Sequence, residues 1–491
     1  MRLSVIDEEV GWQRLDRRML LVHPVKEIGR FIVPLIVFVV FGRSSSDGGL
    51  WGLAALGFPV VLGLLRYVTT TYRISDGRIE LRHGLLNKQV LSTPLDRVRT
   101  VDLTASPIHR LLGLVTVRIG TGSSSSKGDE RLILDGLTQT AAEQLRGTLL
   151  HVSSSADPEA DSGAGAEARA RVVLRLDPSW VRFAPLTTSG LVIAGAALGF
   201  VTQAMHTFAV SPHVNTDELA RAGLALLIVG GVLSVLVVLC VLAVAGYVVT
   251  NFGFVLSHTK SDGSWHLRRG LFTTRETSLD DARVSGVTIG EPIGLRLARG
   301  GRLSAIVTGL GKKQAGSSLL VPPAPRTEVD RVAVEVLHFS APVFGELRRH
   351  GPRAVRRRWT RALVPAAAVA AVCVFLTFAV SGWFTLGAPL ALVVGVALAL
   401  DRTRGLGHAL VDGHLVARSG SLDRRREALA APSIIGWNLR ATWFQRRAGL
   451  TDLTATTAGG RQRVRVLDIP HDDGVALART AQPGLLDQFL L

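Results

Sequence analysis

Six apolar segments, arranged in three pairs, constrain the fold of this chain more than any other feature of its sequence. A helix that crosses a bilayer needs about 20 predominantly apolar residues. The pairs are 25–41 with 49–65, 183–205 with 222–247, and 362–382 with 385–400. Apart from three ionisable residues at the very start of the first segment, their interiors carry no charged side chain. The pattern predicts six transmembrane helices in three hairpins.

Basic residues are distributed unevenly around these segments. The turns within the pairs contain only Arg43 and Arg221 as basic residues, whereas arginines such as Arg66, Arg182 and Arg402 crowd the outer ends. Lys and Arg close to helix ends favour the cytoplasmic side of a membrane. We therefore expect a multi-pass protein of a bacterial-type inner membrane, with both termini and all long polar regions in the cytoplasm.

The chain carries 56 Lys+Arg against 39 Asp+Glu, a formal net charge of +17. Such a balance is also typical of nucleic-acid-binding proteins. However, no basic stretch is interleaved with aromatic residues in the manner of a single-strand binding surface. Because membrane segments are present, we interpret the charge as topology and attraction to anionic lipid headgroups. No nucleic-acid partner is expected.

The three long polar regions repeat one pattern of short strands followed by a helix. A glycine and a later apolar residue recur at a constant interval, and the pairs are Gly84 with Val98, Gly270 with Val284, and Gly420 with Ile434. The hairpin-turn dipeptides Asp76-Gly77 and Asp412-Gly413 precede the first and third of these glycines by equal distances. The second region has extra residues around 258–265, which predict a longer hairpin or loop. Thr138 is expected to cap a helix that ends near residue 150.

The first region resembles a known family. The run Tyr72-Arg-Ile-Ser-Asp76-Gly-Arg-Ile-Glu-Leu-Arg-His-Gly84, continued by Leu95-Asp96 and Arg110-Leu-Leu-Gly113, is similar to the bacterial pleckstrin-homology-like (bPH2) domains of the YdbS/YdbT membrane-protein family. The second region keeps Tyr247-Val-Val-Thr-Asn251, Gly270 and Leu279-Asp280. The third keeps Asp412, Gly420 and Gly449, but has His408 for the tyrosine and Leu429-Ala430 for the Leu-Asp pair. The third domain is therefore described as degenerate.

The resemblance implies an α+β membrane protein in which each hairpin is followed by a cytoplasmic PH-like antiparallel β-sheet domain with a C-terminal helix. On this sequence it predicts an N-terminal cytoplasmic segment 1–23, hairpins 24–66, 183–247 and 362–400, PH-like domains 67–151, 248–340 and 401–491, a linker 152–182 and a basic juxtamembrane linker 341–361. It supplies no catalytic or cofactor-binding residue, and it suggests a role in envelope homeostasis or stress tolerance.

The motif residues also have a structural interpretation, which we favour over ligand contact. Glycines at such places mark turns that need a positive φ or a close approach of backbone. Aspartates there accept hydrogen bonds from backbone or arginine and hold a loop. The residues concerned are Tyr72, Asp76, Gly84, Asp96, Gly113, Gly270, Asp280, Gly420 and Gly449.

A dense basic run directly before the fifth apolar segment is the best candidate for a functional surface. Basic residues beside a membrane attract anionic lipids, at about 1 kcal/mol each near the surface. The predicted lipid-contact residues are Arg348, Arg349, Arg353, Arg356, Arg357, Arg358, Trp359 and Arg361. Simple enforcement of topology explains the same residues, and the two roles do not exclude each other. Arg424-Arg425-Arg426 is a second basic run, which we interpret as a solvated hairpin tip or part of a basic face.

No constellation of residues predicts catalysis, a cofactor, a metal site or a small-molecule substrate. The sequence has no G-x-S-x-G or H-E-x-x-H motif, and no metal role is assigned to His408, Asp412 and His414. We expect a non-enzymatic scaffold or binding protein whose PH-like domains contact anionic lipid, an unknown protein partner or one another. The alternative is a transporter or channel component built from repeated hairpins, which would need polar or broken helices at the bilayer midplane.

The charge distribution makes a prediction about topology. A fluorescent protein that folds only in the cytoplasm, fused after Leu491, should fluoresce in intact cells, while alkaline phosphatase at the same place should be inactive. A matched fusion inside the turn at 206–221 should give the opposite pair of signals. Active phosphatase at the carboxyl terminus would contradict the predicted orientation.

Overall fold

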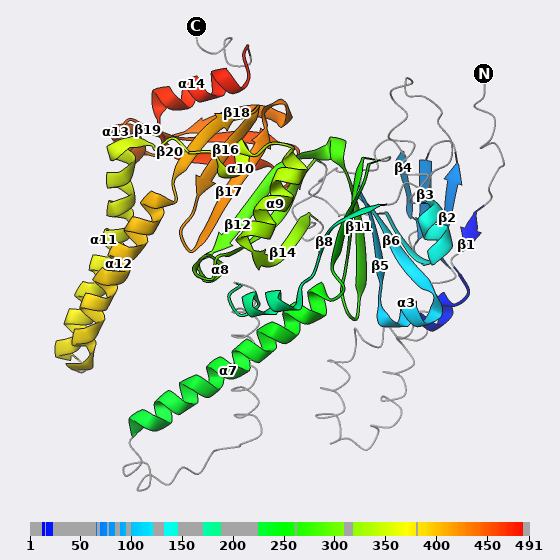
Figure 1. Cartoon of the computed structure of the whole chain (residues 1–491), viewed down its shortest axis with the longest axis horizontal. Coiled ribbons are helices and arrows are strands. Elements are labelled where there is room, and N and C mark those ends of the chain that lie inside the picture. The colour runs from blue at the N-terminus through cyan, green and yellow to red at the C-terminus, as the bar shows by residue number, and fades with distance from the viewer. Residues whose placement is uncertain are drawn as a thin grey trace. The chain divides into compact units, whose positions relative to one another are not determined.

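The computed structural model describes residues 12–14, 16–22, 65, 69–75, 78–83, 89–94, 100–120, 132–145, 170–187, 224–260, 263–308, 318–379 and 382–484 (Figure 1). The chain divides into two compact units, 1–172 with 254–281, and 173–253 with 282–491. The division falls between Asp281 and Ala282, which is inside the predicted second PH-like domain, 248–340. The two halves of that domain therefore belong to different units.

The first unit contains two antiparallel sheets. A four-stranded sheet has the order β1-β2-β3-β4, with the bounds Gln13–Arg14, Thr71–Ser75, Arg78–His83 and Gln89–Pro94. A seven-stranded sheet has the order β7-β6-β5-β11-β10-β9-β8. Its strands in chain order are β5 (Thr100–Ala105), β6 (Leu114–Gly120), β7 (Leu132–Thr138), β8 (Arg171–Arg175), β9 (Val255–Thr259), β10 (Ser264–Arg269) and β11 (Thr274–Asp280). The helix α3 (Pro107–Leu112) lies between β5 and β6.

Alternating apolar residues of the first repeat form the core between these sheets. Ile79 and Leu81 of β3 pack with Val101 of β5 and Val117 of β6, and all four are buried. The helix at 139–145 adds Ala142 and Leu145 to this core, and the Thr138 hydroxyl accepts a hydrogen bond from the Ala141 amide. The expected cap is therefore present. The apolar period of two along each strand places these side chains on one face.

The second unit is built in the same way. A six-stranded sheet has the order β14-β13-β12-β17-β16-β15, and a three-stranded sheet has the order β18-β19-β20. In chain order the strands are β12 (Val284–Pro292), β13 (Gly300–Val307), β14 (Leu319–Pro325), β15 (Gly407–Val411), β16 (His414–Ser419), β17 (Asp423–Ala430), β18 (Ile434–Arg440), β19 (Leu450–Thr457) and β20 (Arg463–Pro470). The helices α8 (Ile293–Leu297), α9 (Arg326–Leu337), α10 (Ala341–Phe344), α13 (Trp443–Arg447) and α14 (His471–Ala481) accompany them.

Sheets continue from one repeat into the next, which no sequence pattern predicted. In the first unit β5 of the first repeat pairs antiparallel with β11 of the second repeat, with Val101 opposite Ser278. In the second unit β12 of the second repeat pairs with β17 of the third, with Ile289 opposite Arg426. An unpaired strand edge exposes backbone groups that need partners. Each repeat thus uses its neighbour to cover an edge.

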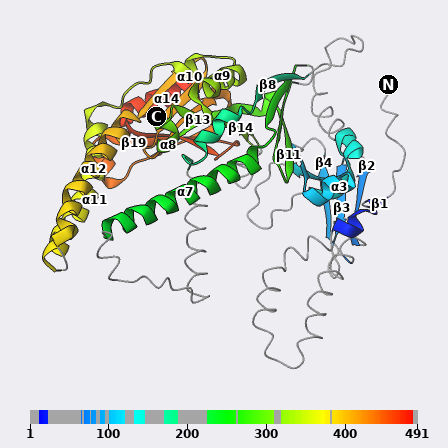
Figure 2. The same ribbon diagram turned by 60° about the horizontal axis from the view of Figure 1, so that its bottom comes forward.

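Two described helices are long and apolar enough to cross a membrane: α11 (Gly351–Ala379) and the helix from Phe384 to Arg404, which contains α12 (Gly387–Arg404). They lie side by side as a hairpin in Figure 1 and Figure 2. An added Cβ on Gly395 would lie 2.5 Å from the Ala366 Cβ, so small residues let the two helices approach closely. This arrangement matches the third predicted hairpin, although α11 begins well before residue 362.

The other predicted membrane segments are described only in part. Segments 25–41 and 49–65 lie outside the described residues except for residue 65, as does 188–205. The helix α7 (Leu224–Asn251) covers most of the predicted segment 222–247 and continues beyond it. Phe183, the predicted start of the third segment, instead ends the 3₁₀ helix η3 (Pro178–Phe183) and is fully buried. Six helices in three hairpins remain a prediction.

Strand pairing corrects the alignment of the second repeat. Tyr247 lies in α7, not in a strand, so it is not the counterpart of Tyr72. Tyr72 is opposite Leu81 and His408 is opposite Ala417, and the residue in the same register of the second repeat is Leu256, opposite Leu267. The five residues Tyr247–Asn251 at the end of α7 resembled the start of a strand because so short a run does not distinguish a helix from a strand.

The sequence alignment of Asp280 in the second repeat with Asp96 in the first is also wrong. Asp280 ends β11 opposite Ser264, just as Pro94 ends β4 opposite Arg78 and Ala430 ends β17 opposite His414. The counterpart of Asp280 is therefore Pro94. In the second repeat β9 ends at Thr259 and β10 begins at Ser264, a separation longer than that between Val411 of β15 and His414 of β16.

Several motif glycines have positive φ angles. Gly270 and Gly420 have φ of 114° and 101°, and a Cβ on either would lie within 2.3 Å of a backbone oxygen. Gly113 and Gly449, with φ of 69° and 65°, follow the short helices α3 and α13. In the second repeat Arg299 occupies this place with φ of 55°, a conformation that favours glycine. Asp76, Gly84 and Asp96 lie outside the described residues.

Three predicted connecting segments are parts of the fold. Within 1–23, β1 pairs with β2, and Met19 and Val22 are buried against Leu114. Within the predicted linker 152–182, residues 171–175 form the strand β8 and 178–182 belong to η3. Within the basic linker 341–361, residues 341–344 form α10 and residues from 351 onward belong to α11.

The junction of the second and third repeats depends on Gly286. A Cβ there would lie 2.0 Å from the Ala428 carbonyl oxygen across the β12–β17 pair. We expect Gly286→Ala to lower the free energy of unfolding by about 1–3 kcal/mol, because overpacking forces the backbone to move. The measurement is thermal or denaturant unfolding of the full chain in detergent micelles.

Gly436 provides a matched control. It occupies the same place in the third repeat, where a Cβ would meet no atom within 4 Å. Gly436→Ala should therefore change the free energy of unfolding by less than about 0.5 kcal/mol. Equal losses in the two variants would contradict a role for close strand pairing at the junction.

Candidate membrane-interface site

The last strand of each repeat contains an irregularity at an equivalent position. Leu137, Ala324 and Ile469 pair with Val115, Gly301 and Thr451, and the register shifts immediately beyond these pairs. The residues just before them are Gly136, Pro323 and Asp468, which we call the bulge residues. A bulge turns a side chain or carbonyl away from its regular direction. In all three repeats the bulge residue contacts residues at or next to one end of a predicted apolar segment.

In the first repeat the contact is apolar. Met19, in the short helical stretch 19–22 before the first apolar segment, is fully buried. A Cβ on Gly136 would lie 2.0 Å from the Met19 Cγ, and Gly136 has φ of 84°. Arg18 donates a hydrogen bond to the Leu112 carbonyl at the end of α3, 2.9 Å away. Glycine at the bulge therefore makes room for the methionine.

In the second repeat the contact is a hydrogen bond. The Tyr247 hydroxyl, near the end of α7, donates to the Pro323 carbonyl oxygen at 2.9 Å. Proline at the bulge has no amide hydrogen, and the sheet does not need one there. A tyrosine that is buried along most of its ring but bonded at its tip holds α7 at the sheet.

In the third repeat the contact is ionic. The Asp468 carboxylate accepts a hydrogen bond from Arg357 Nε at 2.8 Å and forms an ion pair with Arg358 at 2.7 Å. Asp468 is 1% exposed, and both arginines, from the second turn of α11, are 13% exposed. Gln445 of α13 also donates to Asp468, at 2.8 Å. Removing one partner of a buried pair costs about 3–5 kcal/mol, because the other charge is left uncompensated.

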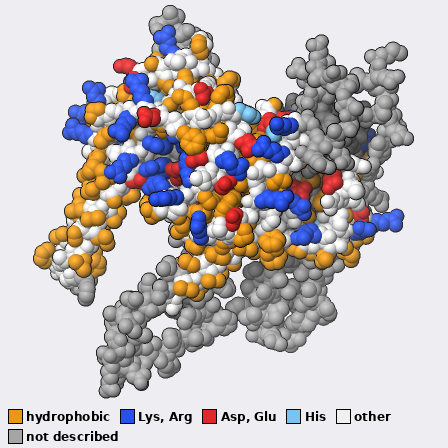
Figure 3. All heavy atoms as spheres, viewed as in Figure 1, with side chains coloured by type: hydrophobic (Ala, Val, Ile, Leu, Met, Phe, Trp, Pro, Cys, Tyr) orange, Lys and Arg blue, Asp and Glu red, His pale blue; other side chains and the backbone are white. Residues whose placement is uncertain are grey.

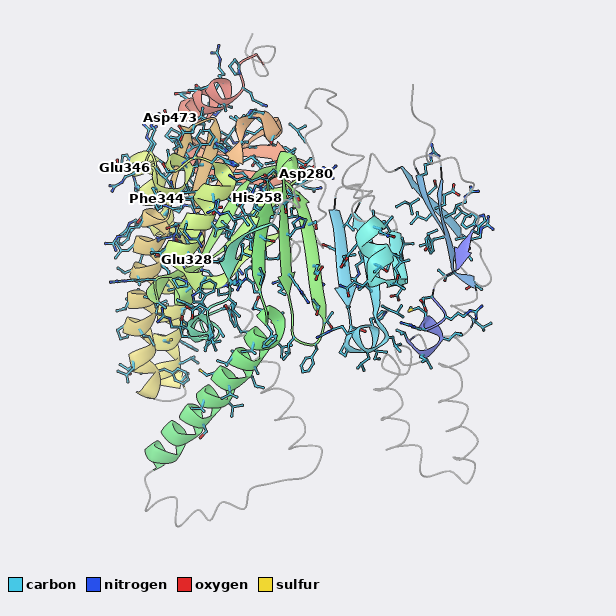
Figure 4. The ribbon with its side chains drawn as sticks, turned by 45° about the vertical axis from the view of Figure 1, so that its right-hand side comes forward. His258, Asp280, Glu328, Phe344, Glu346 and Asp473 are labelled. Carbon is cyan, nitrogen blue, oxygen red and sulfur yellow. The ribbon has the colours of Figure 1, made fainter. Side chains whose placement is uncertain are left out.

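The arginines among the predicted lipid-contact residues therefore divide into two groups. Arg357 and Arg358 pair with the buried Asp468 and so attach α11 to the third domain. Trp359 is half-buried. Arg348 is exposed but lies 3.0 Å from Asp473 of α14, which Figure 4 labels. The exposed members are Arg348, Arg349, Arg353, Arg356 and Arg361.

The distribution of side chains agrees with an interface at this level. Figure 3 shows hydrophobic side chains over the α11–α12 hairpin toward its tip, and Lys and Arg side chains gathered near the start of α11. Long basic side chains can extend along apolar surface and keep their charged ends in water. The exposed arginines thus lie where anionic headgroups would meet the end of a membrane helix.

The second basic run also lies at the end of the hairpin. Arg424 donates to the Asp401 carboxylate at 2.7 Å, and Arg296 of α8 pairs with the same oxygen at 2.8 Å. Arg426 donates to the Pro342 and Gly345 carbonyls, and burial lowers its pKa to about 10. These arginines belong to β17, so the interpretation as a solvated hairpin tip is wrong.

A buried histidine pair connects the start of α11 to β15. His408 Nδ1 and His350 Nε2 are 2.8 Å apart, and His350 Nδ1 lies 2.9 Å from the Leu467 carbonyl beside the bulge. Burial lowers the pKa of both histidines, and burial together with the neighbouring His350 and Arg348 lowers the pKa of His408 to about 4. Arg348 and His408 also exchange backbone hydrogen bonds. One neutral imidazole must donate and the other accept for this pair to form.

Sequence reasoning missed Asp468, Asp401, Gln445 and the histidine pair. Asp468 interrupts the alternating apolar pattern Val464, Val466, and its counterpart in the first repeat is a glycine. An acidic residue on the buried face of a strand requires a basic partner, and that signal was available. Among the described residues, no group of three or more His, Cys, Asp or Glu could hold a metal ion.

Comparisons with known proteins follow the same division into repeats. A family model described as "Bacterial PH domain" matches residues 28–153 and 360–482, together about half of the chain. A relative, the UPF0699 transmembrane protein YdbT of Bacillus subtilis (strain 168), is 23% identical over 126 residues. That match covers 25% of this chain and 25% of the relative. No solved structure matches the chain.

The family model matches the first and third repeats but not the second. The motif residues predicted the opposite, because the second repeat keeps more of them than the third. The second repeat has the longer β9–β10 connection and Arg299 at the place of Gly113 and Gly449. These departures from the shared pattern lie within the repeat that the family model leaves unmatched.

The histidine pair predicts a pH dependence of stability. The folded state holds both imidazoles neutral, so their folded pKa values lie below the usual 6.5. In the unfolded chain they bind protons near pH 6.5, and stability should therefore fall as the pH drops from about 6.5 toward about 4. Unfolding midpoints measured across this range should show the loss.

His408→Gln keeps a polar side chain but removes one titrating group. This variant should lose less stability than the wild type between these pH values, whatever its stability at neutral pH. His471→Gln is a control, because that residue is exposed. Identical pH profiles for His408→Gln and the wild type would contradict the assignment.

Proposed function

The chain belongs to the bacterial PH domain family, and from this premise we propose that it is a non-enzymatic binding or scaffold protein embedded in the membrane. Its PH-like domains would contact anionic lipid headgroups at the membrane surface, or a protein partner located there. The family membership, the transmembrane relative and the two apolar helices α11 and α12 support a membrane location. A role in envelope homeostasis or stress tolerance is part of the proposal.

The proposed topology has six transmembrane helices in three hairpins, with both termini and all PH-like domains in the cytoplasm. The paired apolar segments and the arginines at their outer ends support it. In each repeat the bulge residue contacts a segment next to a predicted membrane helix. Gly136 contacts Met19, Pro323 contacts Tyr247, and Asp468 contacts Arg357. The equivalence of these contacts supports three similar hairpins.

The observation that carries the lipid proposal is the division of the basic run. Arg357 and Arg358 both pair with Asp468 and are largely buried, whereas Arg356 and Arg361 are exposed on the same helix. If the run served only to hold α11 on its domain, the exposed side chains of Arg356 and Arg361 would not be needed for it. Basic residues at the end of a membrane helix attract anionic lipids by about 1 kcal/mol each.

A double substitution tests the proposal. Arg356→Gln with Arg361→Gln should weaken binding of phosphatidylglycerol by about 2 kcal/mol, roughly thirtyfold, and leave phosphatidylcholine binding unchanged. Native mass spectrometry of the full chain in detergent, titrated with each lipid, measures both. The substituted side chains are exposed, so the fold should remain intact.

The matched control is Arg461→Gln with Arg463→Gln, in the β19–β20 region. It removes the same charge from exposed positions of the same domain that do not adjoin a membrane helix. This variant should bind phosphatidylglycerol within about twofold of the wild type. Equal losses in the two variants would mean that net charge, not the hairpin end, attracts the lipid.

A further inference from the structure

An exposed apolar patch lies at the end of the α11–α12 hairpin. It consists of Ile293 and Leu297 of α8 and Leu422 in the β16–β17 turn, which we call the α8 patch. These side chains are 42%, 80% and 59% exposed. Leu295, between the first two, is fully buried and fixes α8 to the domain. A single exposed leucine needs no explanation, but a group of three at one place does.

Direct contacts tie the α8 patch to the end of α12. Arg296, next to Leu297, pairs with the Asp401 carboxylate at 2.8 Å, and the Ile293 amide donates to the Leu422 carbonyl at 2.7 Å. A Cβ on Gly405 would lie 2.6 Å from the Gly420 carbonyl oxygen, so the β16–β17 turn packs closely against the helix end. The patch therefore has a fixed position relative to α12.

That position is the boundary between apolar and polar residues of the helix. Leu400 is the last residue of the predicted apolar segment, and Asp401 is the first ionisable residue after it. Gly405 lies about 6 Å further along the axis at the α-helical rise. Because Arg296 and Arg424 hold α8 and β17 on Asp401, the patch lies at the level where α12 would leave the hydrocarbon.

A second membrane-adjoining segment reaches α8. A Cβ on Gly294 would lie 2.6 Å from the Leu186 carbonyl oxygen. Leu186 lies within the third predicted apolar segment, near its start. The helix α8 is thus in contact with residues close to two membrane boundaries.

Basic side chains surround the patch. Arg299 lies two residues after the end of α8 and is exposed, and Arg296 and Arg302 are partly exposed. Apolar side chains flanked by arginine are typical of helices that lie in the membrane interface, with the apolar face in the acyl boundary and the charges among headgroups. A protein partner in the cytoplasm would not require the patch to lie at this level.

We propose that the α8 patch inserts into the boundary between headgroups and acyl chains. The occupant of the patch is the lipid bilayer itself, and insertion depends on apolar burial. The proposed function concerns attraction of anionic lipid by a different surface, the exposed arginines of α11. The patch should therefore remain inserted in a bilayer without anionic lipid. It would fix the tilt of the third hairpin relative to its domain.

Site-directed spin labelling of the full chain tests the proposal. In a Cys240→Ser, Cys373→Ser background, a nitroxide is attached at Leu297→Cys and the protein is placed in phosphatidylcholine nanodiscs. Oxygen concentrates in the bilayer, whereas a water-soluble nickel chelate stays outside. The ratio of oxygen to nickel collision rates should be several-fold higher than at a water-exposed site.

Ile435→Cys is the matched control. Ile435 is apolar, 64% exposed and on β18, which Figure 1 places away from the hairpin tip in the same unit. Equal ratios at the two sites would overturn the proposal. A high ratio at Leu297 only when phosphatidylglycerol is added would also overturn it, because insertion would then follow charge. Spin–spin broadening that vanishes on dilution with unlabelled protein would assign the patch to a second copy.

The lipid-binding test of Arg356 and Arg361 and this test fail independently. Loss of phosphatidylglycerol preference with a high Leu297 ratio retains insertion and rejects the lipid site. The converse result retains the lipid site and rejects insertion. Because Leu297 is so exposed, its replacement leaves the core intact.

Discussion

The contact between each domain's last strand and its membrane-adjoining segment is the constraint on which the rest of the structure depends. It occurs at one register position in three repeats, but with three chemistries. Met19 packs on Gly136, Tyr247 donates to the Pro323 carbonyl, and Arg357 and Arg358 face Asp468. A bulge is suited to this task because it aims one residue out of the regular pleat. The backbone geometry persists while the side chains that use it change.

Sheet continuity is the second consequence of the repeat. The β5–β11 and β12–β17 pairs join the first repeat to the second and the second to the third. A repeat of this kind cannot be excised cleanly, because its edge strands would lose their partners. The compact units consequently divide in the middle of the second repeat instead of between repeats. Sheet pairing thus connects neighbouring repeats through their edge strands.

Local features of the fold were predictable from sequence. The recurring glycines predicted Gly270 and Gly420 at tight turns, and Asp412-Gly413 predicted the β15–β16 hairpin, because these residue types satisfy positive φ. Pairing between repeats was not predictable, since it depends on which edges meet in space. The sequence did not predict which arginines of the basic run are buried, because Asp468, with which Arg357 and Arg358 pair, lies more than a hundred residues later in the chain. Tyr247 was wrongly aligned with Tyr72 because a run of five residues does not distinguish the end of a helix from the start of a strand.

The ionic contact of the third repeat offers the most direct measurement. A double-mutant cycle combines Arg358→Met with Asp468→Asn and measures the free energy of unfolding of the full chain in detergent. If the bulge residue holds α11 on its domain, the two substitutions should be non-additive by about 1–3 kcal/mol, because each removes the same contact. Losses that add within about 0.5 kcal/mol would show that Asp468 and α11 are energetically independent.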